Sequence, residues 1–287
     1  MGIRISGACA LMLPVCLFAA EHAAEHHVAE HRDKWSRTFK IGAGQDRQLT
    51  IENITGNIKV TGDSGSEVRV TVHESWHSDS AEDLAKARAD VKLATSQSGN
   101  MVRLYLDGPF RDKDHWREKN RWENEVHFRH DFEVLVPRDI NLDLKTINGR
   151  ELAVTNVNGE FNLHNINGSV TLTNATGWGT FKTINGSVKA VFDSNPSKPS
   201  KFETLNGSID VTFRPDLNAD LRLSTMHGEV YTDFEVVPLT TPVSSERFGE
   251  GRKYRINSRR SVRVGSGGTE HEFKTMNGSI KIRKDGK

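Results

Sequence analysis

The sequence predicts an all-β fold, a parallel β-solenoid built from short strands with Asn-Gly corners and one short helix. Three observations predict it: glycines recur every nine or ten residues, apolar residues keep step with them, and the residues beside each glycine do not suit a hairpin. The composition agrees, because 24 glycines and an aromatic fraction of 7% are typical of a chain with many turns and a lean core.

The repeat is clearest between residues 142 and 192, where Gly149, Gly159, Gly168, Gly177 and Gly186 recur at spacings of ten, nine, nine and nine. Further copies surround Gly207, Gly228 and Gly278, and an early copy surrounds Gly56. A fixed period of this kind indicates a repeat architecture, and we expect the apolar columns that accompany it to face the core. The first column is Leu152, Phe161, Val170 and Val188, and the second is Leu144, Val154, Leu163, Leu172 and Phe181. The third lies just before each Asn-Gly or Thr-Gly pair and is Ile147, Val157, Ile166, Ala175 and Ile184.

The residues beside each Asn-Gly pair argue for a corner. Asn-Gly between apolar runs normally indicates a two-residue hairpin, whose flanking residues share one face of the sheet. Here the first flanking residue is apolar and the second polar, as in Ile147/Arg150 and Ile184/Ser187. A bend into the next face satisfies both, so we expect parallel coils with asparagine ladders along the corners. The asparagines are Asn148, Asn158, Asn167, Asn185, Asn206 and Asn277.

Residues 1–20 predict a signal peptide. Arg4 precedes thirteen almost wholly apolar residues, Ala8 to Ala20, a run too short to span a bilayer. Both cysteines, Cys9 and Cys16, lie in this leader, so the body is expected to have no disulfides. We expect export to the periplasm or the cell envelope and surface, with no transmembrane span after cleavage because no later apolar run reaches eighteen residues.

Residues 21–34 form a linker rich in His, Glu and Ala. It contains H-x-x-E-H twice, from His22 and from His27, which formally matches an inverted zinc-peptidase motif. Two histidines four apart on a helix could chelate zinc, but nothing downstream provides a third ligand. A solvated spacer is the favoured interpretation and metal capture the alternative; no cofactor is predicted.

Residues 35–137 predict an N-terminal β region with one helix near residues 79–91. Ser80 can cap that helix, and Leu84, Ala87 and Val91 share a face. Residues 138–287 form the Asn-Gly repeat, continuous with the region before it.

A charged loop at 108–131 is the candidate binding segment. Its candidate residues are Trp116, Arg117, Arg121 and Trp122, because Trp and Arg together stack on sugar rings or dock a protein. A solvated flap is the alternative. A second basic stretch, 247–263, suits anionic glycans or lipid head groups, or a solvated edge strand.

The run DFEVLVPRDINLDLKTINGRELAV, followed by copies of x-N-G-S-h-x-h, resembles a bacterial family called domain of unknown function 4097, described as candidate adhesins. The resemblance covers about Trp35 to Lys287. It implies a β-solenoid on an exported or envelope-associated protein, and it brings no catalytic residues to place on this chain.

A net charge of +1 removes the bulk electrostatic basis for nucleic-acid binding. We expect a non-catalytic envelope protein that presents its surface to a cell-surface glycan, the cell wall or an envelope protein. One alternative is an envelope-stress or signalling accessory that binds a membrane regulator through the Trp116/Trp122 loop. The other is a polysaccharide-active β-helix enzyme, which the scattered acidic residues disfavour; no catalytic or metal residue is predicted.

Overall fold

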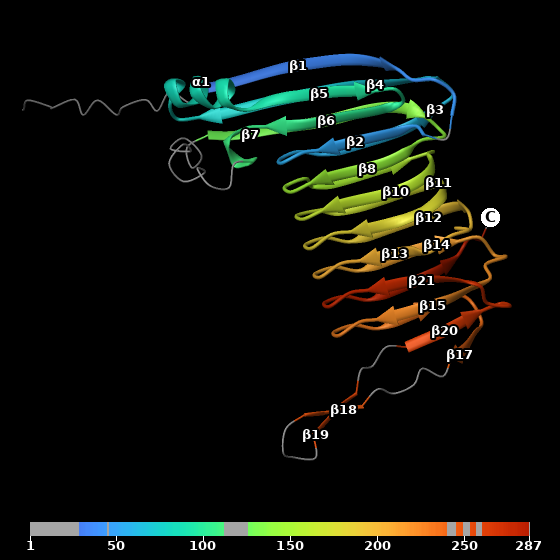
Figure 1. The fold of residues 1–287 in the computed structure, drawn as a ribbon. Coiled ribbons are helices and arrows are strands. Elements are labelled where there is room, and N and C mark those ends of the chain that lie inside the picture. The colour runs from blue at the N-terminus through green and yellow to red at the C-terminus, as the bar shows by residue number, and fades with distance from the viewer. Residues whose placement is uncertain are drawn as a thin grey trace, which may run out of the picture.

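The computed structural model describes residues 29–44, 46–111, 126–239, 245–248, 253–256 and 260–286. Twenty strands join in one sheet of mixed orientation, and β18 (Ser245–Phe248) pairs with β19 (Lys253–Ile256) in a separate one. The described residues contain a single α-helix, so the predicted all-β class with one helix is confirmed. Figure 1 shows the strands beneath one another like rungs, from the blue and green N-terminal end to the red C-terminal end.

Most strands lie in two rows, and the chain alternates between them. Neighbours within each row are parallel, which supports bends over hairpins throughout residues 142–192. Row A is, in spatial order, β6 (Met101–Asp107), β2 (Gln48–Glu52), β8 (Asn141–Thr146), β10 (Asn158–Asn165), the second half of β11 (Ser169–Lys182), β13 (Ser200–Glu203), β21 (Thr269–Lys274) and β15 (Ala219–Ser224). Row B is β7 (Val126–Pro137), β3 (Ile58–Asp63), β9 (Glu151–Thr155), the first half of β11, β12 (Val188–Ser194), β14 (Ile209–Phe213), β22 (Ile280–Lys284) and β16 (Val230–Thr232).

The two ends of the sheet correct the prediction of a wholly parallel fold. At the N-terminal end, β1 (Ala29–Lys40), β4 (Glu67–Ser78) and β7 are antiparallel, as are β5 (Lys92–Ser98) and β6. At the other end, β20 (Arg260–Val264) runs antiparallel to both β15 and β17 (Val236–Leu239). Antiparallel strands can be joined by a tight turn, and Gly99 with φ +59° makes the turn between β5 and β6.

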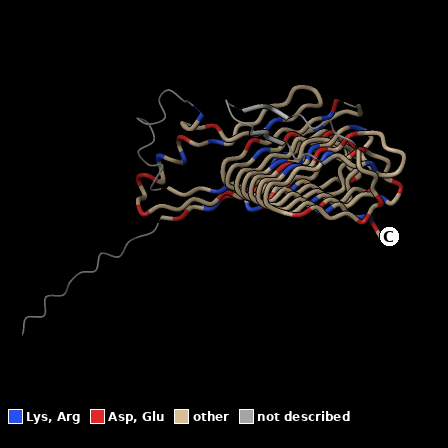
Figure 2. The backbone as a smooth tube through the Cα atoms, turned by 90° about the horizontal axis from the view of Figure 1, so that it is seen from below, with Lys and Arg blue, Asp and Glu red and all other residues tan. Residues whose placement is uncertain are grey.

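The N-terminal end forms a cap, defined here as β1, β4, β5, β7 and α1 (Ala81–Asp90). The Ser80 side chain accepts a hydrogen bond from the Asp83 backbone N–H, which starts α1 as the sequence predicts. Leu84 and Ala87 on α1 are buried in a cluster with Trp76 of β4. The cap projects past the ends of the row A strands (Figures 1 and 2), with η1 (Pro109–Arg111) following β6.

Spatial order differs from chain order at the C-terminal end. β21 lies between β13 and β15, and β22 lies between β14 and β16. The chain therefore builds the outermost coil first and then returns to fill the position above it. Identical registers on both sides of β21 and β22 allow this, and the repeat pattern alone does not predict it.

The core lies between the two rows and consists mainly of Val, Leu and Ile, with a stack of phenylalanines in its C-terminal half. Phe202 stacks on Phe181 at a centroid distance of 5.0 Å and on Phe273 at 4.9 Å, all from row A. From row B, Phe192 and Phe213 stack at 5.5 Å and meet the row A rings edge-on. Each of these rings is almost fully buried, which contributes roughly 1.5–3 kcal/mol per ring.

The corners correct the prediction for the third apolar column. Val157 and Ala175 are buried as predicted, but Ile147 is 37% exposed, and Ile166 and Ile184 are half-buried. The residue before each of these isoleucines points inward instead and donates a hydrogen bond to a glycine carbonyl of the neighbouring coil. The bonds are Thr146 to Gly56, Asn165 to Gly149, and Thr183 to Gly168.

Close stacking of the corners explains their glycines. A Cβ added at Gly168, where φ is +141°, would lie 1.8 Å from the carbonyl oxygen of Gly149. Only glycine allows two coils to approach at this point.

Candidate functional site

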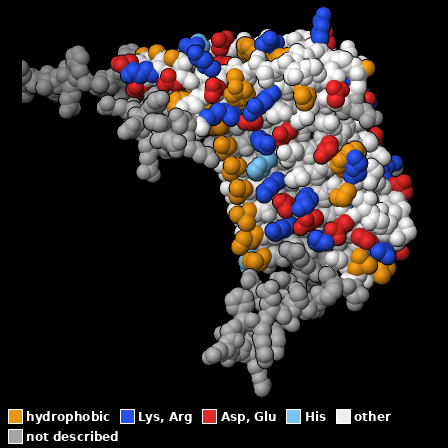
Figure 3. Space-filling model, viewed as in Figure 1, with side chains coloured by type: hydrophobic (Ala, Val, Ile, Leu, Met, Phe, Trp, Pro, Cys, Tyr) orange, Lys and Arg blue, Asp and Glu red, His pale blue; other side chains and the backbone are white. Residues whose placement is uncertain are grey.

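Seven corners stack in register along one edge of the molecule and form what we call the corner strip. Each corner contributes four residues, the first of which is apolar in every case. We call the column of first residues the apolar ridge: Ile54, Ile147, Ile166, Ile184, Leu205, Met276 and Met226, in spatial order. Leu205 is 43%, Met276 38% and Met226 66% exposed, and Figure 3 shows a hydrophobic column along this edge below the cap.

The second residue is asparagine at five successive corners, and these asparagines form an amide ladder beside the ridge. The Nδ2 of Asn167 donates to Oδ1 of Asn148 at 2.8 Å, and the same bond continues through Asn185, Asn206 and Asn277 at 2.7–2.8 Å. The predicted ladder is thus present for five of six asparagines. Asn158 lies in β10 instead, where it donates to Asp139, so its inclusion was wrong.

The fourth residue of each corner completes the strip. It is serine at the four successive corners that start with Ile166, Ile184, Leu205 and Met276. The strip therefore carries no charge over these four corners, although Lys, Arg, Asp and Glu are interspersed over the rest of the body (Figure 2). Charge returns toward its ends, at Arg150 and Glu229.

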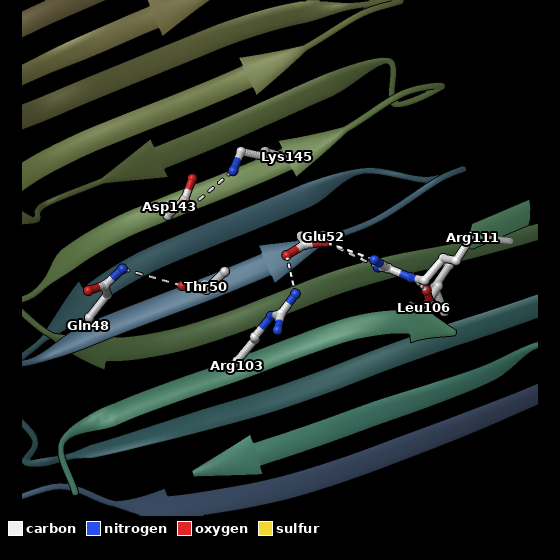
Figure 4. Close-up of polar contacts among 8 residues, drawn as sticks. All are labelled: Gln48, Thr50, Glu52, Arg103, Leu106, Arg111, Asp143 and Lys145. Atoms are coloured by element: carbon white, nitrogen blue, oxygen red, sulfur yellow. Dashed lines mark hydrogen bonds and ion pairs between the residues drawn. The ribbon is translucent and has the colours of Figure 1, made fainter. Parts of the chain in front are cut away.

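A charged cluster lies on the outer face of row A next to the predicted binding loop (Figure 4). Glu52 accepts hydrogen bonds from Arg103 at 2.7 Å and from Arg111 at 3.1 Å, and both guanidinium groups lie over the ring of Tyr105, at 4.8 and 4.7 Å. Burial alone raises the pKa of Glu52, but the bonds from the two arginines outweigh it and hold the pKa below its usual value. This cluster fixes Arg111, the last described residue before the gap at 112–125.

An open cleft of about 580 Å³ lies on the cap. His77 and His127 are direct cross-strand neighbours in it, next to Glu30 on β1. Among the described residues, however, no group of three or more His, Cys, Asp or Glu side chains is arranged to hold a metal ion.

Several predicted features lie outside the described residues. These are the four loop residues Trp116, Arg117, Arg121 and Trp122, the signal peptide at 1–20 and most of the His-rich linker. Of the basic stretch at 247–263, the structure describes only strand segments. None of the helices that the structure describes has the length and hydropathy needed to cross a bilayer.

The sequence contained the signal for the corner strip, which the prediction used to place the bends but not to place the apolar residues outside the core. The apolar-before, polar-after asymmetry at Asn-Gly indicates a bend, and a residue at the outside of a bend need not face the core. Thr146 and Thr183, which are buried where isoleucine was expected, show which side of the bend faces inward.

Comparison with known proteins gives only distant similarity. No family model and no curated protein matches the chain. A solved structure provisionally described as a cell adhesion protein from Clostridium sporogenes is 10% identical, with a TM-score of 0.43, over 89% of this chain and 100% of its own. One provisionally described as an adhesin from Bacteroides fragilis is also 10% identical, with a TM-score of 0.24, over 88% and 97%. The functional argument therefore rests on this chain's own residues.

Proposed function

We propose that this chain is a non-catalytic, exported envelope protein that presents a binding surface to a glycan, the cell wall or another protein. In this proposal the parallel strands of rows A and B, which we call the parallel ladder, act as a β-solenoid. The corner strip supports this proposal most directly. It repeats the same kinds of side chain at its four central corners, spaced about 4.8 Å apart as neighbouring strands are. A repetitive surface of this kind suits a repetitive or extended ligand.

The position of the charged loop supports a second candidate, an accessory protein that binds a membrane regulator. Arg111 is held by Glu52 and by its Nε bond to the Leu106 carbonyl at 2.7 Å, so the chain enters residues 112–125 from a fixed point on row A. A loop presented from a rigid scaffold is a common place for a partner site. Trp116 and Trp122 would then be its anchors.

Binding of the exported protein to a glycan array and to isolated cell-wall polysaccharide tests the first proposal. We expect binding that survives substitution of Trp116 and Trp122 by alanine. A pull-down from the periplasm that enriches one membrane regulator, and loses it in the double Trp→Ala variant, would instead favour the accessory role. Turnover of a uronic-acid polymer by the purified protein would overturn the non-catalytic assignment.

A further inference from the structure

The corner strip is a regular surface whose composition the fold does not fully explain. Its four central corners read Ile-Asn-Gly-Ser, Ile-Asn-Gly-Ser, Leu-Asn-Gly-Ser and Met-Asn-Gly-Ser in spatial order. Glycine and asparagine have structural reasons, given above. The core does not require the serine at all four corners, nor an apolar residue that is half-buried at Ile166 and Ile184 and exposed at Leu205 and Met276.

Each asparagine of the amide ladder keeps hydrogen-bonding capacity for a ligand. A side-chain amide has two N–H donors and two acceptor lone pairs on its oxygen. Within the ladder, Asn185 donates once to Asn167 and accepts once from Asn206, at 2.8 Å each. One donor and one lone pair remain at each inner corner, on an exposed side chain that the ladder holds in place.

The apolar ridge and the serine column lie on either side of these amides. The ridge provides aliphatic surface, and Ser169, Ser187, Ser208 and Ser279 each add a hydroxyl group. A ligand that matches this strip has hydroxyl groups in pairs beside C–H surface, repeated along its length. Pyranose sugars joined in an unbranched chain have this pattern.

Other occupants fit the strip less well. A second copy would bury too little: seven rungs at about 4.8 Å make a strip about 29 Å long, so at about 10 Å width two copies bury roughly 600 Å², about half the lower limit of a stable interface. The cap projects past the strip (Figures 1 and 3), so a flat bilayer laid along it would meet the cap first. A charged polymer finds no opposite charge at the four central corners.

From this chemistry we infer that the corner strip binds an uncharged, unbranched glycan strand that lies along the coil axis. The inference rests on the proposed function and specifies its ligand class. Ridge side chains contact the C–H faces of the sugar rings, and the free amide and serine groups bond their hydroxyls. Because the four central corners add similar contacts, affinity rises with oligomer length until the oligomer spans these four corners, and then levels off.

The probes are cellulose, chitin and linear β-1,3-glucan as uncharged polymers, with alginate as the charged polymer. In co-sedimentation, we expect the exported protein to bind at least one uncharged polymer and to ignore alginate. Leu205→Ser with Met276→Ser removes ridge surface, and Ser187→Asp with Ser208→Asp adds charge to the strip. Each double variant should weaken binding about tenfold or more.

Matched controls separate the strip from general effects. Leu135→Ser removes an exposed leucine from the cap, and Asn174→Asp adds a carboxylate at an exposed position outside the seven corners; both should keep wild-type binding. Circular dichroism and thermal unfolding confirm that each variant is folded.

The remaining outcomes overturn the inference in distinguishable ways. Glycan binding that survives both double variants leaves the proposed function intact and rejects the corner strip as its site. Binding to alginate alone rejects the uncharged class. Absence of all glycan binding rejects both the inference and the glycan branch of the proposed function. A dimer in analytical ultracentrifugation that is lost in Leu205→Ser with Met276→Ser would assign the ridge to self-association.

Discussion

The cap and the parallel ladder solve the same problem by different means. Both must bury one face of their strands. The parallel ladder does so by repeating one coil of short strands, with stacked phenylalanines inside and glycines and amides at the corners. The cap uses three strands of twelve residues each and a cluster that occurs once, around Trp76, Phe128 and the helix α1. The stability of the parallel ladder therefore depends on how closely its backbones approach, and the stability of the cap on how well its individual side chains pack.

Truncating one central aromatic in each region should have the largest effect and should break the comparison most clearly. Phe202→Ala removes a ring that stacks on two others, and should cost about 3–5 kcal/mol of unfolding free energy. Trp76→Ala should cost a similar amount, because its ring lies 5.2 Å from Phe128 in a buried cluster. Chemical denaturation measures both, with exposed Lys201→Ala as the control.

Hydrogen exchange then locates each loss. Phe202→Ala should speed exchange in β11, β13 and β21, because coils contact mainly their neighbours. Trp76→Ala should speed it in β4, β7 and α1, which share its cluster. Uniformly faster exchange in both variants would mean that cap and ladder unfold as one unit.

Replacing glycine by alanine in each region should show whether a loss of stability comes from a clash between neighbouring backbones or from strain in the residue's own φ angle. Gly168→Ala places a Cβ against the Gly149 carbonyl, so we expect a loss of about 3 kcal/mol or more of unfolding free energy. Gly99→Ala, in the cap-side hairpin, has open space around it and only its positive φ to strain, so about 1 kcal/mol should be lost. Equal shifts in the denaturation midpoint would contradict the close-stacking account.

Acid should weaken both regions to a similar extent. Burial lowers the pKa of His271 to about 4, and neither ring nitrogen has a hydrogen-bond partner among the described residues. Burial also lowers the pKa of His130 in the cap to about 4, although Asp131 opposes the shift. In the unfolded chain these histidines bind protons near pH 6.5, whereas in the folded chain they do so only near pH 4. The unfolding free energy is therefore highest above pH 6.5 and falls between about pH 6.5 and 4, by up to roughly 3 kcal/mol per histidine.

Denaturation at several pH values tests this. His271→Phe keeps a ring beside Phe213 and should flatten the pH dependence, whereas His73→Gln, an exposed substitution in the cap, should leave it as in the wild type. A wild-type profile that is flat from pH 7 to 4 would show that these imidazoles are solvated.

Removing single amides should have the smallest effect and sharpen the comparison of hydrogen bonds. Asn185→Ala breaks two hydrogen bonds between coils at 2.8 Å. Asn100→Ala breaks two near the cap, one that its Oδ1 accepts from the Gly42 N–H and one that its Nδ2 donates to Asp46. Each should cost about 1–2 kcal/mol, since the groups are exposed and water replaces part of the loss. A larger loss for Asn185→Ala would indicate cooperativity along the amide ladder.

The sequence predicted the periodic part of the molecule best. The period of residues such as Leu144, Leu152 and Leu163 predicted the buried columns, and Ser80 predicted the start of α1. Strand order was not predictable, because β22 has the same pattern as β16 and either could occupy the outer position. The inward threonines were missed because hydropathy ranks isoleucine above threonine, whereas at a tight bend the glycine carbonyl requires a donor.

Ile147 shows the same limit at the candidate site. Its apolar side chain was assigned to the core from its type alone, and only the position of the bend relative to the strand places it on the surface.

The intercalated position of β21 and β22 has a consequence for how the chain folds. Asn206 and Asn277 are bonded across 71 residues of chain. The coils of β13/β14 and β15/β16 are joined only through β21 and β22, which lie between them and come last in the chain. Closing so long a loop is entropically costly and slow compared with stacking successive coils. The coils of β13/β14 and β15/β16 should therefore stay apart while the chain is being made, and form a stable stack only when β21 and β22 have been added.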